Sequence, residues 1–218
     1  MWLELVGVSS NDFLDRDRGP RIDLSTSLAN DDDVLVIGLL SGDAGDGEEP
    51  GEPSLVITDD LLDDAAAEAV SAALRALGAT GKTGEVTRVP APASLPVRLV
   101  VAVGLGADDD ISADSLRQAA GTVMRSLEGT GPAASTLAAA GEDALAAVAE
   151  GFFLGGYRFD AFRSAKSTAS AKPLPGRVSL LVGQKTKELK AQLTEALIGA
   201  DAVALARDFV NTPPNELC

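Results

Sequence analysis

The sequence predicts an α/β fold: a mixed, largely parallel central sheet with helices on both faces, stacked in three layers, α/β/α. The continuous apolar run at residues 34–40, and the run at residues 98–103 that is apolar from Leu99 on, have the length and composition of strands that are buried on both faces. A helical apolar period follows each of them, in residues 59–77 and 113–127. Strands that alternate with helices in this way are typical of α/β proteins.

The first part of the chain carries strand signals at residues 3–8 and 34–40. The acidic, glycine-rich stretch 41–53 predicts a solvated loop that leads to a short strand at residues 55–57. Its carboxylates lack the D-x-D-x-D-G spacing of calcium-binding loops, so we expect no metal site there.

An alanine-rich helix is expected at residues 59–77, because apolar residues recur on one face and Gly78 can close the last turn. The G-A-T-G-K-T sequence that begins at Gly78 looks like a phosphate-binding loop, but Ala76 stands where that motif requires its first glycine. This loop also follows a helix rather than a strand. The sequence therefore does not predict a nucleoside triphosphate site.

Prolines bound a short edge strand expected at residues 86–89. The buried strand at residues 98–103 then enters a G-L-G turn, after which Ser112 is the expected N-cap of the helix at 113–127. This strand, glycine turn and helix form one α/β unit.

The remaining strands are expected at residues 136–139 and 178–182, with a helix at 142–157 between them. Gly151 and Gly155 lie one turn apart in that helix. Each costs about 1 kcal/mol relative to alanine, so their presence indicates that another backbone approaches closely on that face.

A long helix is expected at residues 186–210, where apolar residues recur every three or four positions. Because the residue before a proline is pushed out of the helical region, Thr212 before Pro213 should end this helix. We therefore expect an α/β domain at residues 1–185, followed at residues 186–218 by this long helix and the turn after it.

Composition excludes several classes of function. The 218 residues carry a net charge of −15, which opposes a nucleic-acid partner, and the absence of histidine removes the commonest catalytic base and metal ligand. The single cysteine, Cys218, allows no internal disulfide. No run of about 18 apolar residues occurs, and the first residues do not form a signal peptide, so we expect a cytoplasmic protein with no membrane partner.

Three segments, in order along the chain, carry a resemblance to a known family. They are V-A-V-G-L-G at residues 101–106, E-G-F-F-L-G-G-Y-R-F-D-A-F-R-S at 150–164 and A-R-D-F-V-N-T-P-P-N-E-L at 206–217. They resemble, respectively, a strand and G-L-G turn, an E-G-x-x-L-x-x-Y-x-F segment and the junction motif R-x-[LF]-V-N-T-P-P-N-x-L in the amino-terminal part of leucyl aminopeptidases, the cytosol aminopeptidase family of metallopeptidases.

The resemblance implies a macro-domain-like fold and a parent enzyme that removes amino-terminal residues from peptides, with leucine favoured. It also implies two divalent metals, zinc or manganese, in a carboxyl-terminal catalytic domain, and assembly of the parent into a homo-hexamer. The family's metal-binding motifs, including N-T-D-A-E-G-R, do not occur in this sequence. We therefore assign no catalytic, metal-binding or cofactor-binding residue and expect this chain alone to be inactive.

The resemblance makes residues 186–218 a linker helix and a junction to the catalytic domain, with the junction at the end of that helix. Arg207 and Asp208 are candidates for contacts across it, although exposed helical charges are more often solvated. Asn211, Pro213, Pro214 and Asn215 are expected to stop the helix and direct the chain, rather than to touch substrate. The aromatic residues of the 150–164 segment are expected in the core, or in part against the catalytic domain.

Two other functions remain open. A stand-alone macro-like module could bind a nucleotide such as ADP-ribose through backbone N–H groups of the turn Gly104 to Ala107, although Asp108, Asp109 and Asp110 at the same turn would repel a diphosphate. A protein-interaction domain could instead use the small apolar stripe of the last helix.

Overall fold

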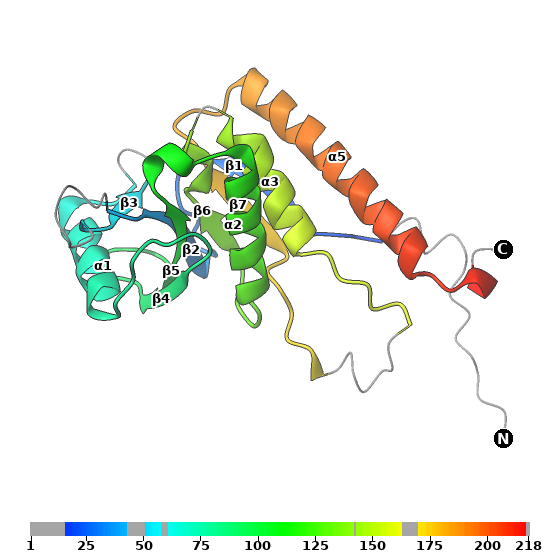
Figure 1. Ribbon diagram of the computed structural model, residues 1–218, viewed down its shortest axis with the longest axis horizontal. Coiled ribbons are helices and arrows are strands. Elements are labelled where there is room, and N and C mark those ends of the chain that lie inside the picture. The colour runs from blue at the N-terminus through cyan, green and yellow to red at the C-terminus, as the bar shows by residue number, and fades with distance from the viewer. Residues whose placement is uncertain (1–15, 43–50, 58–60, 142, 163–169, 217–218) are drawn as a thin grey trace.

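The computed structural model describes residues 16–42, 51–57, 61–141, 143–162 and 170–216 (Figure 1). The described strands are β1 (Arg21–Ser25), β2 (Val34–Leu40), β3 (Ser54–Val56), β4 (Val86–Pro90), β5 (Leu99–Gly106), β6 (Ala133–Ser135) and β7 (Arg177–Leu181). The longer helices are α1 (Asp64–Ala76), α2 (Ala113–Ser126), α3 (Ala144–Gly155) and α5 (Lys187–Asn211). The strand predicted at residues 3–8 lies outside the described residues.

One sheet contains all the described strands, in the order β1-β7-β6-β2-β5-β4, with β3 beside β2. The four pairings from β1 to β5 are parallel, whereas β4 pairs with β5 and β3 pairs with β2 in antiparallel orientation. Because β6 pairs with β2 only along Val34–Val36, β3 takes the place beside β2 at Gly38–Leu40. The sheet is therefore mixed and largely parallel, as predicted.

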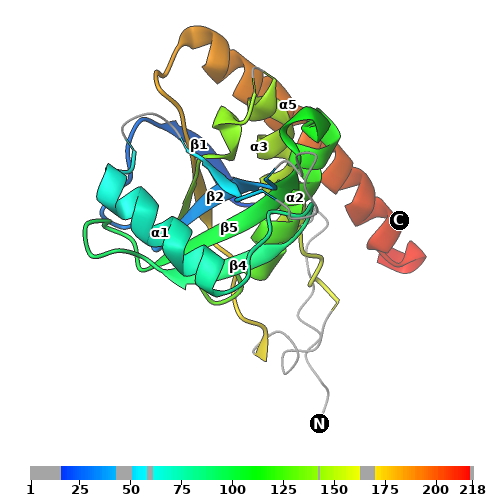
Figure 2. The same ribbon diagram turned by 60° about the vertical axis from the view of Figure 1, so that its left-hand side comes forward.

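Helices cover both faces of the sheet (Figures 1 and 2). Helix α1 packs on one face, where the apolar cluster includes Leu35, Val70 and Leu74. Helices α2 and α3 pack side by side on the other, and α5 lies on the outer side of α3. These layers confirm the predicted α/β architecture.

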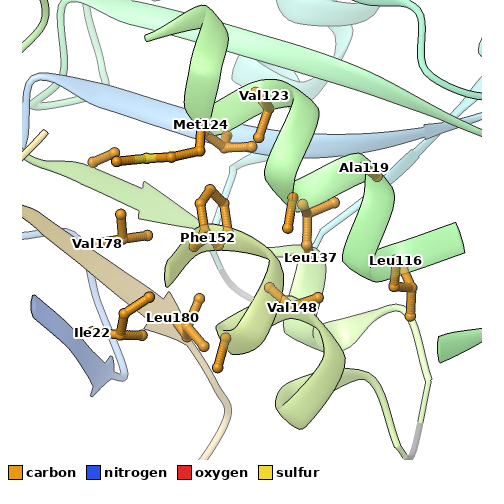
Figure 3. Close-up of a cluster of buried hydrophobic side chains, with 14 of the residues drawn as sticks. Ile22, Leu116, Ala119, Val123, Met124, Leu137, Val148, Phe152, Val178 and Leu180 are labelled. Atoms are coloured by element: carbon orange, nitrogen blue, oxygen red, sulfur yellow. The ribbon is translucent and has the colours of Figure 1, made fainter. Parts of the chain in front are cut away.

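The larger core cluster surrounds Phe152, which is fully buried. In Figure 3 its ring lies among side chains of α2, α3 and β7, including Met124, Val148 and Val178. This confirms the core assignment for Phe152. Phe162, by contrast, is half exposed.

The glycines of α3 lie where α2 approaches most closely. A Cβ atom on Gly151 would lie 2.8 Å from the Cβ of Ala120, and one on Gly155 would lie 2.8 Å from the Cα of Gly121. Any larger side chain would push the two helices apart. The close backbone approach predicted from these glycines is confirmed.

Two local predictions are wrong. The G-L-G segment is not a turn, because β5 continues through Gly104 and Leu105 to Gly106. Glycine is required at position 104 because the backbone of Lys82 lies against it. The strand predicted at residues 136–139 is displaced: β6 ends at Ser135, and Leu137–Ala139 forms a short 3-10 helix.

Helix boundaries follow the capping residues. Ser112 accepts a hydrogen bond from the backbone N–H of Ser115 and caps α2 as predicted. Helix α1 begins later than predicted, with Asp63 as its N-cap. Strand β1 was not predicted. Among the described residues, no helix is long and apolar enough to cross a membrane.

Candidate functional site

Helix α5 ends where the sequence predicts. Thr212 is the C-cap, and its backbone N–H and Oγ1 both donate to the carbonyl oxygen of Asp208, at 2.9 and 2.7 Å. Pro213 cannot continue the helix, and a short 3-10 helix, Pro214–Glu216, follows. The chain thus leaves α5 along a defined path.

Asp208 is the best-buried charged side chain at this end of α5, with 0% exposure. Its Oδ2 accepts hydrogen bonds from Arg18 Nε at 2.7 Å and from Arg16 Nε at 3.1 Å. Its Oδ1 accepts one from the hydroxyl of Tyr157 at 2.8 Å and a second from Arg16. We call Arg16, Arg18, Tyr157 and Asp208 the Asp208 cluster.

Aromatic side chains extend this cluster. The guanidinium of Arg16 lies 5.0 Å from the ring centre of Phe159 and 5.7 Å from that of Tyr157. The guanidinium of Arg207 lies 5.6 Å from the Tyr157 ring centre, and Asn211 Nδ2 donates to the Tyr157 hydroxyl at 3.3 Å. Cation–π contacts of this geometry are favourable when the cation is partly desolvated.

The cluster joins three parts of the chain that are distant in sequence. The arginines come from the segment that leads into β1, Tyr157 follows α3, and Asp208 lies on α5. Two of the three family-like segments of the sequence therefore meet here, through Tyr157 and Asp208. The cluster fixes the last turns of α5 to the α/β body.

The charges in the cluster stabilise one another. Burial alone would raise the pKa of Asp208, but hydrogen bonds from Arg16, Tyr157 and Arg18 outweigh it and hold the pKa below its ordinary value. Burial and the hydrogen bond to Asp208 raise the pKa of Tyr157. At neutral pH Asp208 is thus ionised and Tyr157 protonated, an arrangement that suits a structural clamp rather than proton transfer.

The predicted junction residues differ in how far the structure exposes them to solvent. Arg207, Asn211, Pro214 and Asn215 are exposed, and Pro213 is partly buried. Asp208 is fully buried, so its interpretation as a solvated helical charge is wrong. The physical reason is that two guanidinium groups and a phenol replace its hydration.

Arg16 and Arg18 were missed at the sequence level because the stretch around them has no helical or strand period. One signal was available. Asp208 follows Ala200 and Ala204 at four-residue intervals, and both alanines lie on the buried face of α5. A carboxylate on such a stripe requires cationic partners elsewhere in the fold.

The described residues do not fit a binuclear metal site. No three Asp, Glu, Cys or His side chains gather where they could hold a metal ion within the described ranges. Both carboxylate oxygens of Asp208 already accept hydrogen bonds from Arg16, Arg18 and Tyr157. The acidic loop at 43–50 lies outside the described residues.

Two of the backbone N–H groups considered for binding a diphosphate are hydrogen-bonded within the protein. The N–H of Gly104 donates to the carbonyl oxygen of Glu85 at 2.8 Å, and that of Gly106 donates to the carbonyl oxygen of Gly81 at 2.9 Å. The next residues, Asp108–Asp110, form a short 3-10 helix with three exposed carboxylates. Two of the backbone donors that a nucleotide would need are therefore already used within the protein.

Comparison with known proteins identifies relatives over nearly the whole chain. Residues 44–166 match the family model described as "Cytosol aminopeptidase family, N-terminal domain". Proteins named "Probable cytosol aminopeptidase" from Nocardia farcinica and Rhodococcus opacus are 47% and 44% identical, over 93% of this chain in both cases. The chain spans 39% and 38% of the lengths of these two relatives.

This chain is also similar to part of two solved enzyme structures. The bottromycin maturation enzyme BotP, in complex with Mn, is 28% identical with a TM-score of 0.59, covering 87% of this chain and 33% of BotP. A tomato leucine aminopeptidase mutant is 19% identical with a TM-score of 0.66, covering 92% of this chain and 40% of that enzyme, and shows the shared fold. The chain belongs to the cytosol aminopeptidase family, whose N-terminal domain it matches.

Proposed function

We propose that this chain is the non-catalytic amino-terminal domain of a cytosol aminopeptidase, and that it holds the catalytic domain through α5. The observation that carries the proposal is the match to the family's N-terminal domain, together with relatives that are more than twice as long as this chain. The sequence contains none of the family's metal-binding motifs, which supports a non-catalytic role for this chain and a catalytic role for the following domain.

The parent enzyme would remove amino-terminal residues from peptides, with leucine favoured, as a cytoplasmic homo-hexamer. The names of the relatives and of the tomato structure support aminopeptidase activity, and the Mn complex of BotP supports a divalent metal, manganese or zinc. Two such metals polarise the scissile carbonyl and activate water when bound. Because the described residues do not fit them, their ligands would belong to the following domain.

The role of this chain would be to position that domain. The Asp208 cluster ties the carboxyl-terminal end of α5 to the body, and Pro213 and Pro214 stiffen the exit. Arg207, Asn211 and Asn215 stand exposed beside this exit, where they would contact the next domain. We propose that the α/β domain comprises residues 1–185, and that residues 186–218 form the linker helix and the junction to the next domain.

The test compares this chain with a fusion in which the remainder of the Nocardia farcinica relative follows Leu217. With leucine p-nitroanilide and Mn²⁺ or Zn²⁺, the fusion should show enzyme-like turnover and this chain should show none. Turnover by the chain alone that survives further purification would contradict the proposal.

A further inference from the structure

The carboxyl-terminal half of α5 presents an apolar face to solvent. The exposed fractions are 68% for Ile198, 45% for Val203, 47% for Phe209 and 85% for Val210. The alanines between them, Ala202 and Ala206, are also exposed. We call Ile198, Ala202, Val203, Ala206, Phe209 and Val210 the outer face of α5.

The opposite side of the same helix is already used. Leu193, Ala196, Ala200 and Ala204 are buried where α5 packs on α3. The charged residues of this half are engaged elsewhere: Asp201 pairs with Arg18 at 3.3 Å, Asp208 lies in the Asp208 cluster, and the guanidinium of Arg207 lies over the ring of Tyr157. The outer face is therefore apolar without interruption by charge, which is unusual for a helix surface that stays in water.

The outer face lies next to the point where the chain leaves the domain. Val210, its most exposed member, precedes the C-cap Thr212 by two residues. Figure 1 shows this end of α5 extending past α3, away from the sheet. Polypeptide that follows the exit emerges beside the outer face, so covering it requires only a short connection.

We infer that the outer face of α5 is the docking surface for the domain that follows in the same polypeptide. The inference rests on the proposed function, because the relatives supply more than half of their length beyond the matched region. Docking would bury the exposed Ile198, Phe209 and Val210 side chains. The rigid clamp at Asp208 holds the face in the orientation that the following domain meets.

Photo-crosslinking tests the inference in the fusion with the Nocardia farcinica remainder. Benzoylphenylalanine replaces Val210 in one variant and Ile198 in a second. In a control it replaces Leu77, which is 62% exposed and is the C-cap of α1, the helix on the opposite face of the sheet. After irradiation, the first two variants should give crosslinked peptides that join α5 to the following domain, in a product with the mass of one chain. The Leu77 control should give none.

A product with the mass of two chains would show that another copy covers the face, and would overturn the inference, as would the absence of any product from both α5 positions. Aminopeptidase activity of the same fusion is measured separately. If the fusion is active but the one-chain product is absent, the result contradicts only the inference that the following domain docks on the outer face of α5. An inactive fusion that gives this product contradicts the proposed function alone, and an inactive fusion without it contradicts both.

Discussion

At the residue scale, Asp208 makes the contacts that hold the end of α5 to the rest of the domain. A carboxylate without exposure loses its hydration, and that loss is offset only where strong donors replace the water. Here Arg16, Arg18 and Tyr157 supply those donors. Removing the charge leaves Arg18, which is nearly as buried, without its main counter-ion.

Asp208→Asn should therefore lower the free energy of unfolding by about 3–5 kcal/mol, the range for breaking a buried ion pair. Urea denaturation of the chain at pH 7 measures it. The matched control is Asp201→Asn, whose side chain is half exposed and should cost less than about 1 kcal/mol. Equal losses for the two variants would contradict the role given to Asp208.

The same variant gives a pH prediction. The pKa of Asp208 is lower in the folded protein than its unfolded value of about 3.9, so its contribution to stability is complete above that value. The contribution is lost as the pH falls through the folded pKa. The stability gap between wild type and Asp208→Asn should thus be constant from pH 7 to about 5 and shrink in more acidic solution. Denaturation curves at several pH values measure this gap, and a gap that widens in acid would contradict the assignment.

At the scale of elements, the contact between α2 and α3 depends on glycine. A methyl group on Gly151 would meet Ala120 and the backbone of Arg117. Gly199, in the middle of α5, has nothing within 4 Å of the position a Cβ would take. Alanine substitution at Gly151 therefore tests packing between the helices, whereas the same substitution at Gly199 tests helix propensity alone.

Gly151→Ala should lower the free energy of unfolding by about 1–3 kcal/mol through overpacking. Gly199→Ala should raise it by about 0.5–1 kcal/mol, because alanine loses less conformational freedom in a helix. Thermal and urea unfolding of both variants measure the difference in sign. Stabilisation by both substitutions would show that α2 and α3 do not approach as closely as described.

Elements with a strong local period were predictable from the sequence. The buried strands β2 and β5 and the helices α2, α3 and α5 were expected close to their observed bounds. Strand β1 has only two inward apolar residues, Ile22 and Leu24, which is too little for a pattern. Strand β6 consists of alanine and serine, which favour strands weakly, and it forms because β2 and β7 flank it.

The candidate site was predictable only in part. The end of α5 follows from the proline pair and was predicted. The burial of Asp208 depends on Arg16 and Arg18, about 190 residues earlier in the chain. No local pattern encodes that contact. Likewise, glycine at position 104 is explained by the backbone of Lys82, which only the folded sheet brings there.

At the scale of the whole molecule, the alternative function is a macro-like module that binds a nucleotide. The N–H groups of Gly104 and Gly106 are already hydrogen-bonded within the protein, and three carboxylates follow them. Calorimetric titration with ADP-ribose should therefore give no binding heat. A dissociation constant in the micromolar range would favour the nucleotide-binding alternative.

If this α/β body supports a metallopeptidase without holding its metals, as proposed, bound metal should appear only when the following domain is present. The most direct test is the metal content of the chain and of the fusion, measured by mass spectrometry after both are equilibrated with Mn²⁺ or Zn²⁺ and dialysed. About two metal ions are expected per fusion chain, as in two-metal hydrolases, and no stoichiometric metal in this chain alone. Two tightly bound ions in the chain alone would contradict it.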